Sequence, residues 1–201
     1  DPDELDRLAT GLAPDLTGSL AGRATPVDAE LLAQIVPHAP RTGVVAIARR
    51  PAVDVAAVLA VDRPAPIVLL EDPRTMGNMG ACVRVAAAAD AAAVLTTGSN
   101  DPWHPEALRG AAGLHFALPV ARIESPPVGG RPLVAIDPEG GRLGESGLDP
   151  RSILAFGTER YGLSDALLDR ADARLAIPMR AGVSSLNLAT AVSAVLFSQR
   201  L

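Results

Sequence analysis

From residue 66 to the end of the chain, short apolar runs alternate with segments of helical periodicity. The runs are continuously apolar, which indicates strands that are buried on both faces of a parallel sheet. The predicted strands are PIVLLE (66–71), AAVLTT (92–97), LHFALPV (114–120), PLVAID (132–137), SILAFG (152–157) and ARLAIP (173–178). Helical patterns lie between them, at about 78–90, 104–111, 163–171 and 185–200. This order predicts an α/β fold, a parallel sheet with helices on both faces.

The residues before this alternation have a different pattern, and we expect them to form part of a separate, small α/β domain. Thr25 is placed to cap a helix that ends near residue 36, and GVVAIA (43–48) is a predicted strand. The proline-rich segment VDRPAP (61–66) has the composition of a linker. The expected organisation is therefore a partial N-terminal domain over residues 1–62 and a larger domain over residues 65–201.

Composition bears on the partners that the chain can have. The 201 residues carry a net charge of −5, and all 18 basic residues are arginine. A protein that binds nucleic acid without specificity is usually basic, so binding of RNA would have to rely on local patches. Arg41, Arg49 and Arg50 could form such a patch, although a solvated face explains them equally well.

The sequence also bears on compartment and metal content. Cys82 is the only cysteine, which rules out an internal disulfide and favours a reducing compartment. No apolar run is long enough to span a membrane, and the acidic first residues do not resemble a signal peptide. The three histidines lack the spacing of metal ligands. We therefore expect a cytoplasmic protein that binds no metal and no membrane.

Three stretches combine glycines and polar residues where a predicted strand ends and a helix begins, the edge at which open α/β sheets bind ligands. The first is EDPRTMGNMGACVRVAAAAD (71–90), with Asn78 near the helix start and Arg84 among small apolar residues. Taken alone, an N-cap and a solvated arginine explain this stretch. It lacks the GxGxxG fingerprint, which disfavours a dinucleotide-dependent oxidoreductase.

The second stretch is FGTERYGLSDALLDRAD (156–172). Gly157 follows a predicted strand directly, and Glu159 lies in the glycine loop after it. Ser164 is expected to cap the next helix. The carboxylate of Glu159 could be solvated, or it could hold a nearby arginine in place.

The third stretch is IPMRAGVSSLNLATAVSAVLF (177–197), in which Ser184, Ser185 and Asn187 precede an apolar helix. One such residue is enough for an N-cap. If one of the serines caps the helix, the remaining polar groups can face a ligand. The helix is apolar nearly all round, as expected for a helix that is covered on more than one side, and a subunit interface would supply the second cover.

Together, the three stretches resemble the three successive motifs of the SpoU/TrmH family, which are RNA ribose 2′-O-methyltransferases of the SPOUT class. The resemblance covers about residues 65–201, with the motifs in order and at ordinary spacing. It implies a parallel α/β sheet whose C-terminal segment forms a trefoil knot. It also implies that residues 1–62 are the later part of a ribosomal-protein-like domain that binds the RNA substrate.

By the same resemblance, the motifs supply the catalytic residues Asn78, Arg84, Glu159, Ser185 and Asn187. Arg84 would contact the target ribose and its phosphate, while Glu159 and Asn187 would orient the site. A guanidinium keeps its proton in proteins, so we interpret Arg84 as a cation that stabilises the developing alkoxide rather than as a general base. The apolar helix over 185–200 also predicts a two-fold homodimer.

The cofactor implied by the resemblance is S-adenosylmethionine. It would contact the backbone of Gly157, Ile177 and Leu186, with Met179 nearby, and a side chain at position 157 would fill space that the cofactor needs. The expected reaction transfers its methyl group to a ribose 2′-hydroxyl of rRNA or tRNA. The alternative is a SPOUT module that binds S-adenosylmethionine or RNA and is catalytically inactive. Trp103 could stack on an RNA base, but a packed loop anchor is the simpler interpretation of this residue.

Overall fold

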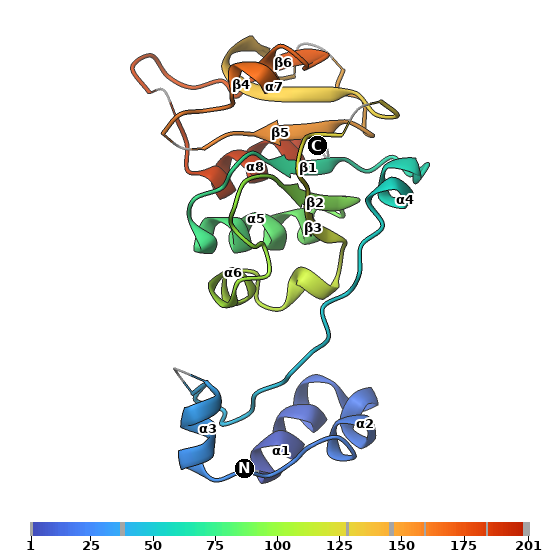
Figure 1. The fold of residues 1–201 in the computed structure, drawn as a ribbon, viewed down its shortest axis with the longest axis vertical. Helices are drawn as coiled ribbons and strands as arrows, with labels where there is room; N and C mark the ends of the chain where they lie inside the picture. Colours follow the sequence, from blue (N-terminus) through green and yellow to red (C-terminus); the bar gives the residue numbers. More distant parts are fainter. Residues whose placement is uncertain are drawn as a thin grey trace. The chain divides into compact units, whose positions relative to one another are not determined.

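The computed structural model describes residues 2–36, 39–127, 129–144, 147–158, 160–183 and 185–198. The chain divides into two compact units, Asp1–Arg50 and Pro51–Leu201 (Figure 1). The boundary precedes helix α4 (Val55–Ala60), because Val58 of this helix packs into the core beneath the sheet of the second unit.

The first unit is helical in its described part. Its elements are α1 (Pro2–Leu12), the 3-10 helix η1 (Pro14–Leu16), α2 (Thr17–Ala21) and α3 (Ala29–Ile35). The predicted strand over residues 43–48 is wrong: no ladder forms there and Ile47 is 94% exposed, since an apolar run without a partner strand gains nothing from extension. Asp28 rather than Thr25 caps α3, and its carboxylate accepts a hydrogen bond of 2.7 Å from the backbone N–H of Leu31.

Six parallel strands form the sheet of the second unit, in the order β3-β2-β1-β5-β4-β6. Their bounds are β1 (Ile67–Leu70), β2 (Ala93–Thr96), β3 (Val120–Arg122), β4 (Leu133–Arg142), β5 (Ile153–Phe156) and β6 (Ala173–Ala176). The predicted parallel sheet is confirmed. Because all strands point the same way, the loops after β4, β5 and β6 emerge at one edge.

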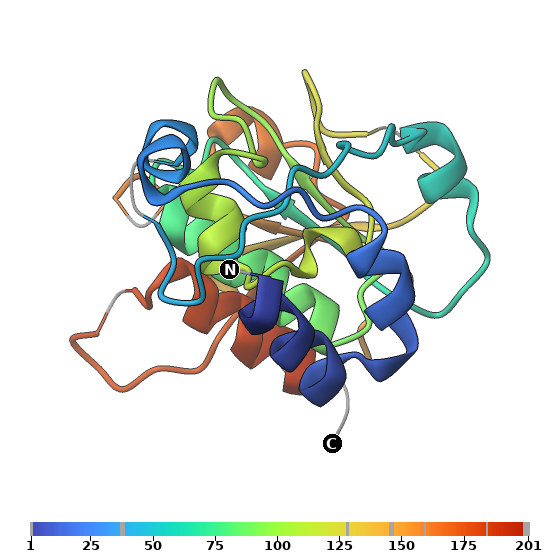
Figure 2. The same ribbon diagram turned by 90° about the horizontal axis from the view of Figure 1, so that it is seen from below.

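Helices cover both faces of this sheet, as predicted. One face carries α5 (Met76–Ala88), α6 (Pro105–Gly110) and α8 (Leu188–Ser198), and α5 and α8 lie side by side (Figure 2). The other face carries α4 and α7 (Asp165–Leu168). Side chains of β1 alternate between the two cores, Val68 and Leu70 on the first and Ile67 and Leu69 on the second. Strand β1 is therefore apolar on both sides.

One predicted strand is wrong over most of its length. Residues 114–116 form a 3-10 helix, η2 (Leu114–Phe116), and β3 starts only at Val120. The apolar run reflects packing: His115 is buried, with its ring 5.0 Å from that of Trp103. The indole N–H of Trp103 donates a 3.0 Å hydrogen bond to the carbonyl of Val120, and the ring is only 9% exposed. Trp103 is a loop anchor, and it is too buried to stack on an RNA base.

The predicted linker at 61–66 lies within the second unit, where the buried side chain of Arg131 holds it in place. Its guanidinium donates hydrogen bonds of 2.7–3.0 Å to the backbone carbonyls of Leu59, Val61, Ala65 and Arg151. Burial lowers the pKa of Arg131. The four carbonyls replace water as partners of the charge, and they fix the chain just before β1 and β4.

Candidate active site

A cavity of about 280 Å³ lies beside the irregular middle of β4, where the loops after β5 and β6 leave the sheet. Its lining includes Asp137 of β4, Gly157 of the loop after β5, and Ile177 and Met179 of the loop after β6. Ser185, just before α8, lines it as well. This is the ligand-binding edge that the order of strands predicts.

The residues expected to contact a cofactor lie together in this cavity. Gly157, Ile177, Met179 and Leu186 all contribute to its wall, although 29 positions separate the first from the last. The reason given for the glycine needs correction, however. A Cβ atom at Gly157 would collide with the backbone of Gly162 and Leu163, so the missing side chain makes room for the chain's own loop.

The loop after β5 is closed on itself. Thr158 and Gly162 exchange two backbone hydrogen bonds of 3.1 and 2.9 Å, and the N–H of Tyr161 donates to Oγ1 of Thr158 at 3.1 Å. Glu159, expected to be catalytic, lies outside the described residues. The bonds on either side of it define a short, closed turn beside the cavity.

Glu71, directly after β1, binds the residue Ser164 that follows this loop. Its carboxylate accepts hydrogen bonds from the backbone N–H of Ser164 at 2.7 Å and from the Ser164 hydroxyl at 2.6 Å. Oγ of Ser164 in turn accepts from the N–H of Leu167 at 3.2 Å, so the predicted cap of α7 is confirmed. The sequence analysis did not identify Glu71. Its position at the end of a predicted strand could have indicated a residue of the site.

Asn187 performs the capping that was expected of a serine. Its Oδ1 accepts hydrogen bonds from the N–H groups of Ala189 and Thr190 at 3.0 and 3.4 Å, at the start of α8. Ser184 lies outside the described residues, and Ser185 faces the cavity. Of the polar residues before α8, Asn187 thus caps the helix and Ser185 lines the cavity.

The amide nitrogen of Asn187 also donates to Oδ1 of Asn78 at 3.2 Å. Asn78 is the third residue of α5, so it is not the N-cap of that helix; Thr75 holds that position. The side chains of the first and third motifs therefore meet.

Arg84 lies on a different side of α5. It is exposed and does not line the cavity. Six residues along a helix correspond to roughly 9 Å of rise and about 240° of rotation, which turns Arg84 away from Asn78 and toward solvent. Within the part of the chain that the structure describes, Arg84 is thus not brought together with the cavity residues.

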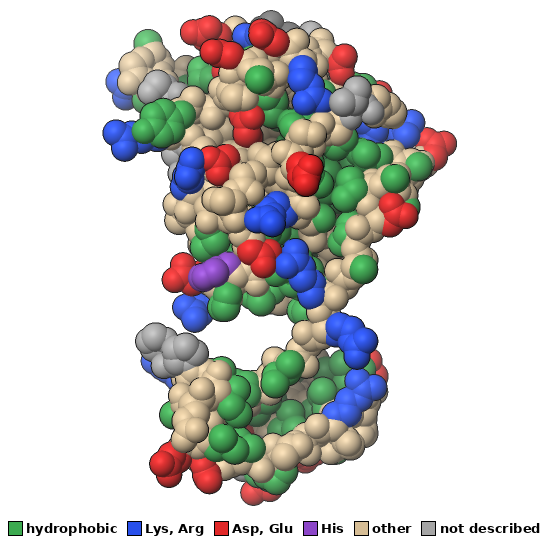
Figure 3. All heavy atoms as spheres, in the orientation of Figure 1, with side chains coloured by type: hydrophobic (Ala, Val, Ile, Leu, Met, Phe, Trp, Pro, Cys, Tyr) green, Lys and Arg blue, Asp and Glu red, His purple; other side chains and the backbone are tan. Residues whose placement is uncertain are grey.

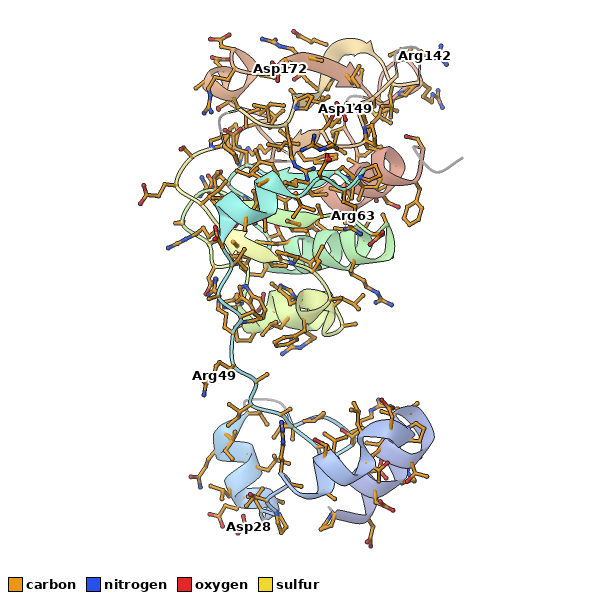
Figure 4. All side chains as sticks on the ribbon, turned by 90° about the vertical axis from the view of Figure 1, so that its right-hand side faces the viewer. Asp28, Arg49, Arg63, Arg142, Asp149 and Asp172 are labelled. Carbon is orange, nitrogen blue, oxygen red and sulfur yellow. The ribbon has the colours of Figure 1, made fainter. Side chains whose placement is uncertain are left out.

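A second hollow of about 490 Å³ adjoins the cavity and shares Ile177 and Met179 with it. Arg142 and Arg180 line this hollow, and Arg142 extends outward from the end of β4 (Figure 4). Arg160 lines the first cavity. The two hollows thus have arginines on their walls, which gives this edge positive side chains in a chain of negative net charge.

Asp137 is a second residue that the sequence analysis missed. It lines the first cavity, and its Oδ1 accepts a hydrogen bond of 2.8 Å from the N–H of Glu139. It ends the predicted strand 132–137, so the rule that ligands bind at strand ends could have found it. In the structure β4 continues past Asp137 to Arg142.

The cavity suits an organic ligand with apolar and charged parts. Its wall is mostly apolar, with backbone groups at Gly157 and Leu186, the hydroxyl of Ser185, and the charges of Asp137 and Arg160. Such a mixture is typical of cofactor sites. Among the described residues, no three His, Cys, Asp or Glu side chains gather as they would around a metal ion, and no helix is long and apolar enough to cross a membrane.

Residues 65–197 match the SpoU rRNA Methylase family. A 23S rRNA (uridine(2479)-2′-O)-methyltransferase of Streptomyces viridochromogenes is 32% identical over 144 residues, 65% of this chain and 50% of the relative. A protein of Mycobacterium bovis described as a tRNA/rRNA methyltransferase is 34% identical over 203 residues, 92% of this chain and 69% of the relative.

Solved structures agree with these relatives. The SpoU methyltransferase AviRb from Streptomyces viridochromogenes, in complex with the cofactor AdoMet, superposes with a TM-score of 0.67 and 30% identity, covering 74% of this chain and 64% of that one. The chain spans about half the length of several curated relatives that it matches.

Proposed function

Because the chain belongs to the SpoU rRNA methylase family, we propose that it transfers a methyl group from S-adenosylmethionine to a ribose 2′-hydroxyl of rRNA or tRNA. The observation that carries this proposal is the meeting of Gly157, Ile177, Met179 and Leu186 in one cavity at the sheet edge. A relative named as a 23S rRNA 2′-O-methyltransferase and a structural neighbour with bound AdoMet support it. The inactive module is the less favoured alternative.

The cavity would hold the cofactor mainly through backbone groups. Gly157 and Leu186 offer N–H and C=O groups to an adenine edge, while Ile177 and Met179 supply apolar contact. When bound, S-adenosylmethionine supplies an electrophilic methyl group on a cationic sulfur. The carboxylate of Asp137 places negative charge in the same cavity, which complements a cationic ligand.

The remaining motif residues would position the ribose. Asn78 and Asn187 are hydrogen-bonded to each other at the starts of α5 and α8, and Ser185 lines the cavity. We assign Glu159 an orienting role. Arg84 would bind phosphate and stabilise the alkoxide as it forms, since a planar guanidinium donates to two oxygens at once and cannot take up the proton itself. The proton would leave to phosphate or water.

RNA would approach over the second hollow. Arg142 and Arg180 line it, and arginine pairs well with phosphate. Elsewhere on the second unit, basic and acidic side chains are interspersed on the face drawn in Figure 3, so a localised contact fits better than a broad basic surface. In the first unit, Arg49 and Arg50 are exposed (Figure 4 labels Arg49), and we assign this unit to RNA binding.

We further propose that the second unit is knotted and dimeric. The segment before α8 shares one cavity wall with β4 and with the loop after β5, and α8 then packs on α5, an arrangement compatible with a threaded C-terminus. Phe197 of α8 remains 40% exposed, and a second copy could cover it. Light scattering at micromolar concentration tests the dimer: twice the chain mass supports it, and a single chain mass refutes it.

Calorimetry and methyl incorporation test the activity. The protein should bind S-adenosylmethionine and not NAD, and it should transfer radioactive methyl groups to unmodified rRNA or tRNA transcripts. Cofactor binding without transfer to either RNA would favour the inactive module. Binding of NAD alone would contradict the proposal altogether.

A further inference from the structure

Tyr161 is an exposed aromatic residue beside the candidate active site. It is the only tyrosine in a sequence with 2% aromatic residues, and it is 77% exposed. Both of its neighbours, Arg160 and Gly162, line the cavity, which places Tyr161 at the cavity rim. By contrast, Trp103 is 9% exposed and belongs to the core.

The guanidinium of Arg160 lies over the ring of Tyr161. Its central carbon is 5.4 Å from the ring centroid, within the range of a cation–π contact. The cation takes up one face of the ring and leaves the remaining surface open to solvent. The pair thus offers a flat aromatic surface with a positive charge behind it.

Hydrogen bonds hold the described backbone near this pair in place. The backbone bonds between Thr158 and Gly162 close the loop, and the N–H of Tyr161 is fixed to Oγ1 of Thr158 at 3.1 Å. Gly157 packs so closely on Gly162 that no Cβ would fit. A surface that is ordered before binding loses little conformational entropy when a ligand stacks on it.

We propose that Tyr161, backed by Arg160, is a stacking platform for a base of the RNA strand next to the ribose that is methylated. An aromatic ring stacks on any base, and a nearby arginine adds attraction for the phosphate backbone. No other exposed side chain at the rim of this cavity combines these two properties among the described residues. The inference rests on the proposed function, because it assumes an RNA ligand at this cavity.

The test uses the full chain and a single-stranded RNA dodecamer that contains 2-aminopurine, whose fluorescence falls when it stacks. Wild-type protein should quench the probe. Tyr161→Phe should bind within about twofold of wild type, while Tyr161→Ala and Tyr161→Leu should bind at least about fivefold more weakly and lose the quenching. Arg160→Gln should also weaken binding. The control Arg170→Gln removes the same charge between α7 and β6 and should leave binding unchanged.

Two further measurements separate this inference from the proposed function. Affinity for S-adenosylmethionine and the melting temperature should be unchanged in Tyr161→Ala, which excludes misfolding. If wild-type protein methylates RNA and Tyr161→Ala binds the dodecamer equally well, the platform is refuted and the function stands. If wild-type protein neither binds nor methylates RNA, the function fails and the platform fails with it.

Discussion

The side-chain amide of Asn187 donates a 3.2 Å hydrogen bond to the side-chain oxygen of Asn78, across 109 positions of the sequence. Asn187 at the same time caps α8 through its own oxygen. One asparagine therefore joins the first and third motifs and fixes the start of the helix that follows the cavity. Because an amide has both donors and acceptors whereas an ionised carboxylate only accepts, an aspartate could not make the same set of bonds.

The Asn78–Asn187 bond should be measurable as a coupling. Asn187→Ala should lower the free energy of unfolding by about 1 kcal/mol through loss of the cap. Combined with Asn78→Ala in a double-mutant cycle, the pair should show a coupling of about 0.5–1.5 kcal/mol in urea unfolding. Strictly additive effects would mean that the two side chains do not interact.

Filling the cavity should abolish cofactor binding without unfolding the protein. Ala191 of α8 lines the cavity and is half-buried, so Ala191→Leu adds carbon atoms on the ligand side. We expect affinity for S-adenosylmethionine to fall about tenfold or more, because overlapping atoms exclude the ligand. Calorimetry measures the affinity and thermal melting serves as control. Unchanged affinity in the folded variant would place the cofactor elsewhere.

Two glycines of α5 should respond oppositely to alanine. A Cβ at Gly80 would collide with the backbone of Ala107 in α6, whereas a Cβ at Gly77 would meet nothing within 4 Å. Gly80→Ala should therefore destabilise by about 1–3 kcal/mol, since the helices must separate. Gly77→Ala should be neutral or stabilise by about 0.5 kcal/mol, because alanine is the better helix former. Denaturant midpoints of both variants test the close contact between the two helices.

Arg84→Ala should reduce methyl transfer by about a hundredfold or more, as expected for loss of a charged group that stabilises developing negative charge. Arg84 is exposed and does not line the cavity, so cofactor affinity should stay unchanged and stability should stay within about 0.5 kcal/mol. Arg84→Lys should fail almost as badly, because an ammonium cannot bind two oxygens in one plane. Single-turnover rates decide the matter: a folded alanine variant with normal rates would remove Arg84 from the mechanism.

Local sequence patterns predicted most of the second unit. Continuous apolar runs identified five of the six strands, because strands buried on both faces carry no polar alternation. The pattern failed where apolar residues serve other packing: 114–116 form a 3-10 helix around the buried His115, and 43–48 have no partner strand. Apolar character alone does not distinguish these cases from strands.

The sequence predicted which backbone segments form the candidate site, but it did not predict the side-chain hydrogen bonds between them. The glycine and the apolar residues that line the cavity follow strand ends, a local signal. The bond from Ser164 to Glu71 spans 93 positions, and that from Asn187 to Asn78 spans 109. No single-sequence pattern specifies such pairs, because they depend on which strands become neighbours.

Mapping the methylated nucleotide tests the central claim most directly. Unmodified rRNA and tRNA transcripts would be incubated with the 201-residue chain and S-adenosylmethionine that carries a deuterated methyl group, then hydrolysed with alkali. The account predicts label in a dinucleotide that resists alkali, since a methylated 2′-oxygen cannot attack the neighbouring phosphate, and no such label with Arg84→Ala. Label on a base, or no label in either RNA although the cofactor binds, would contradict it.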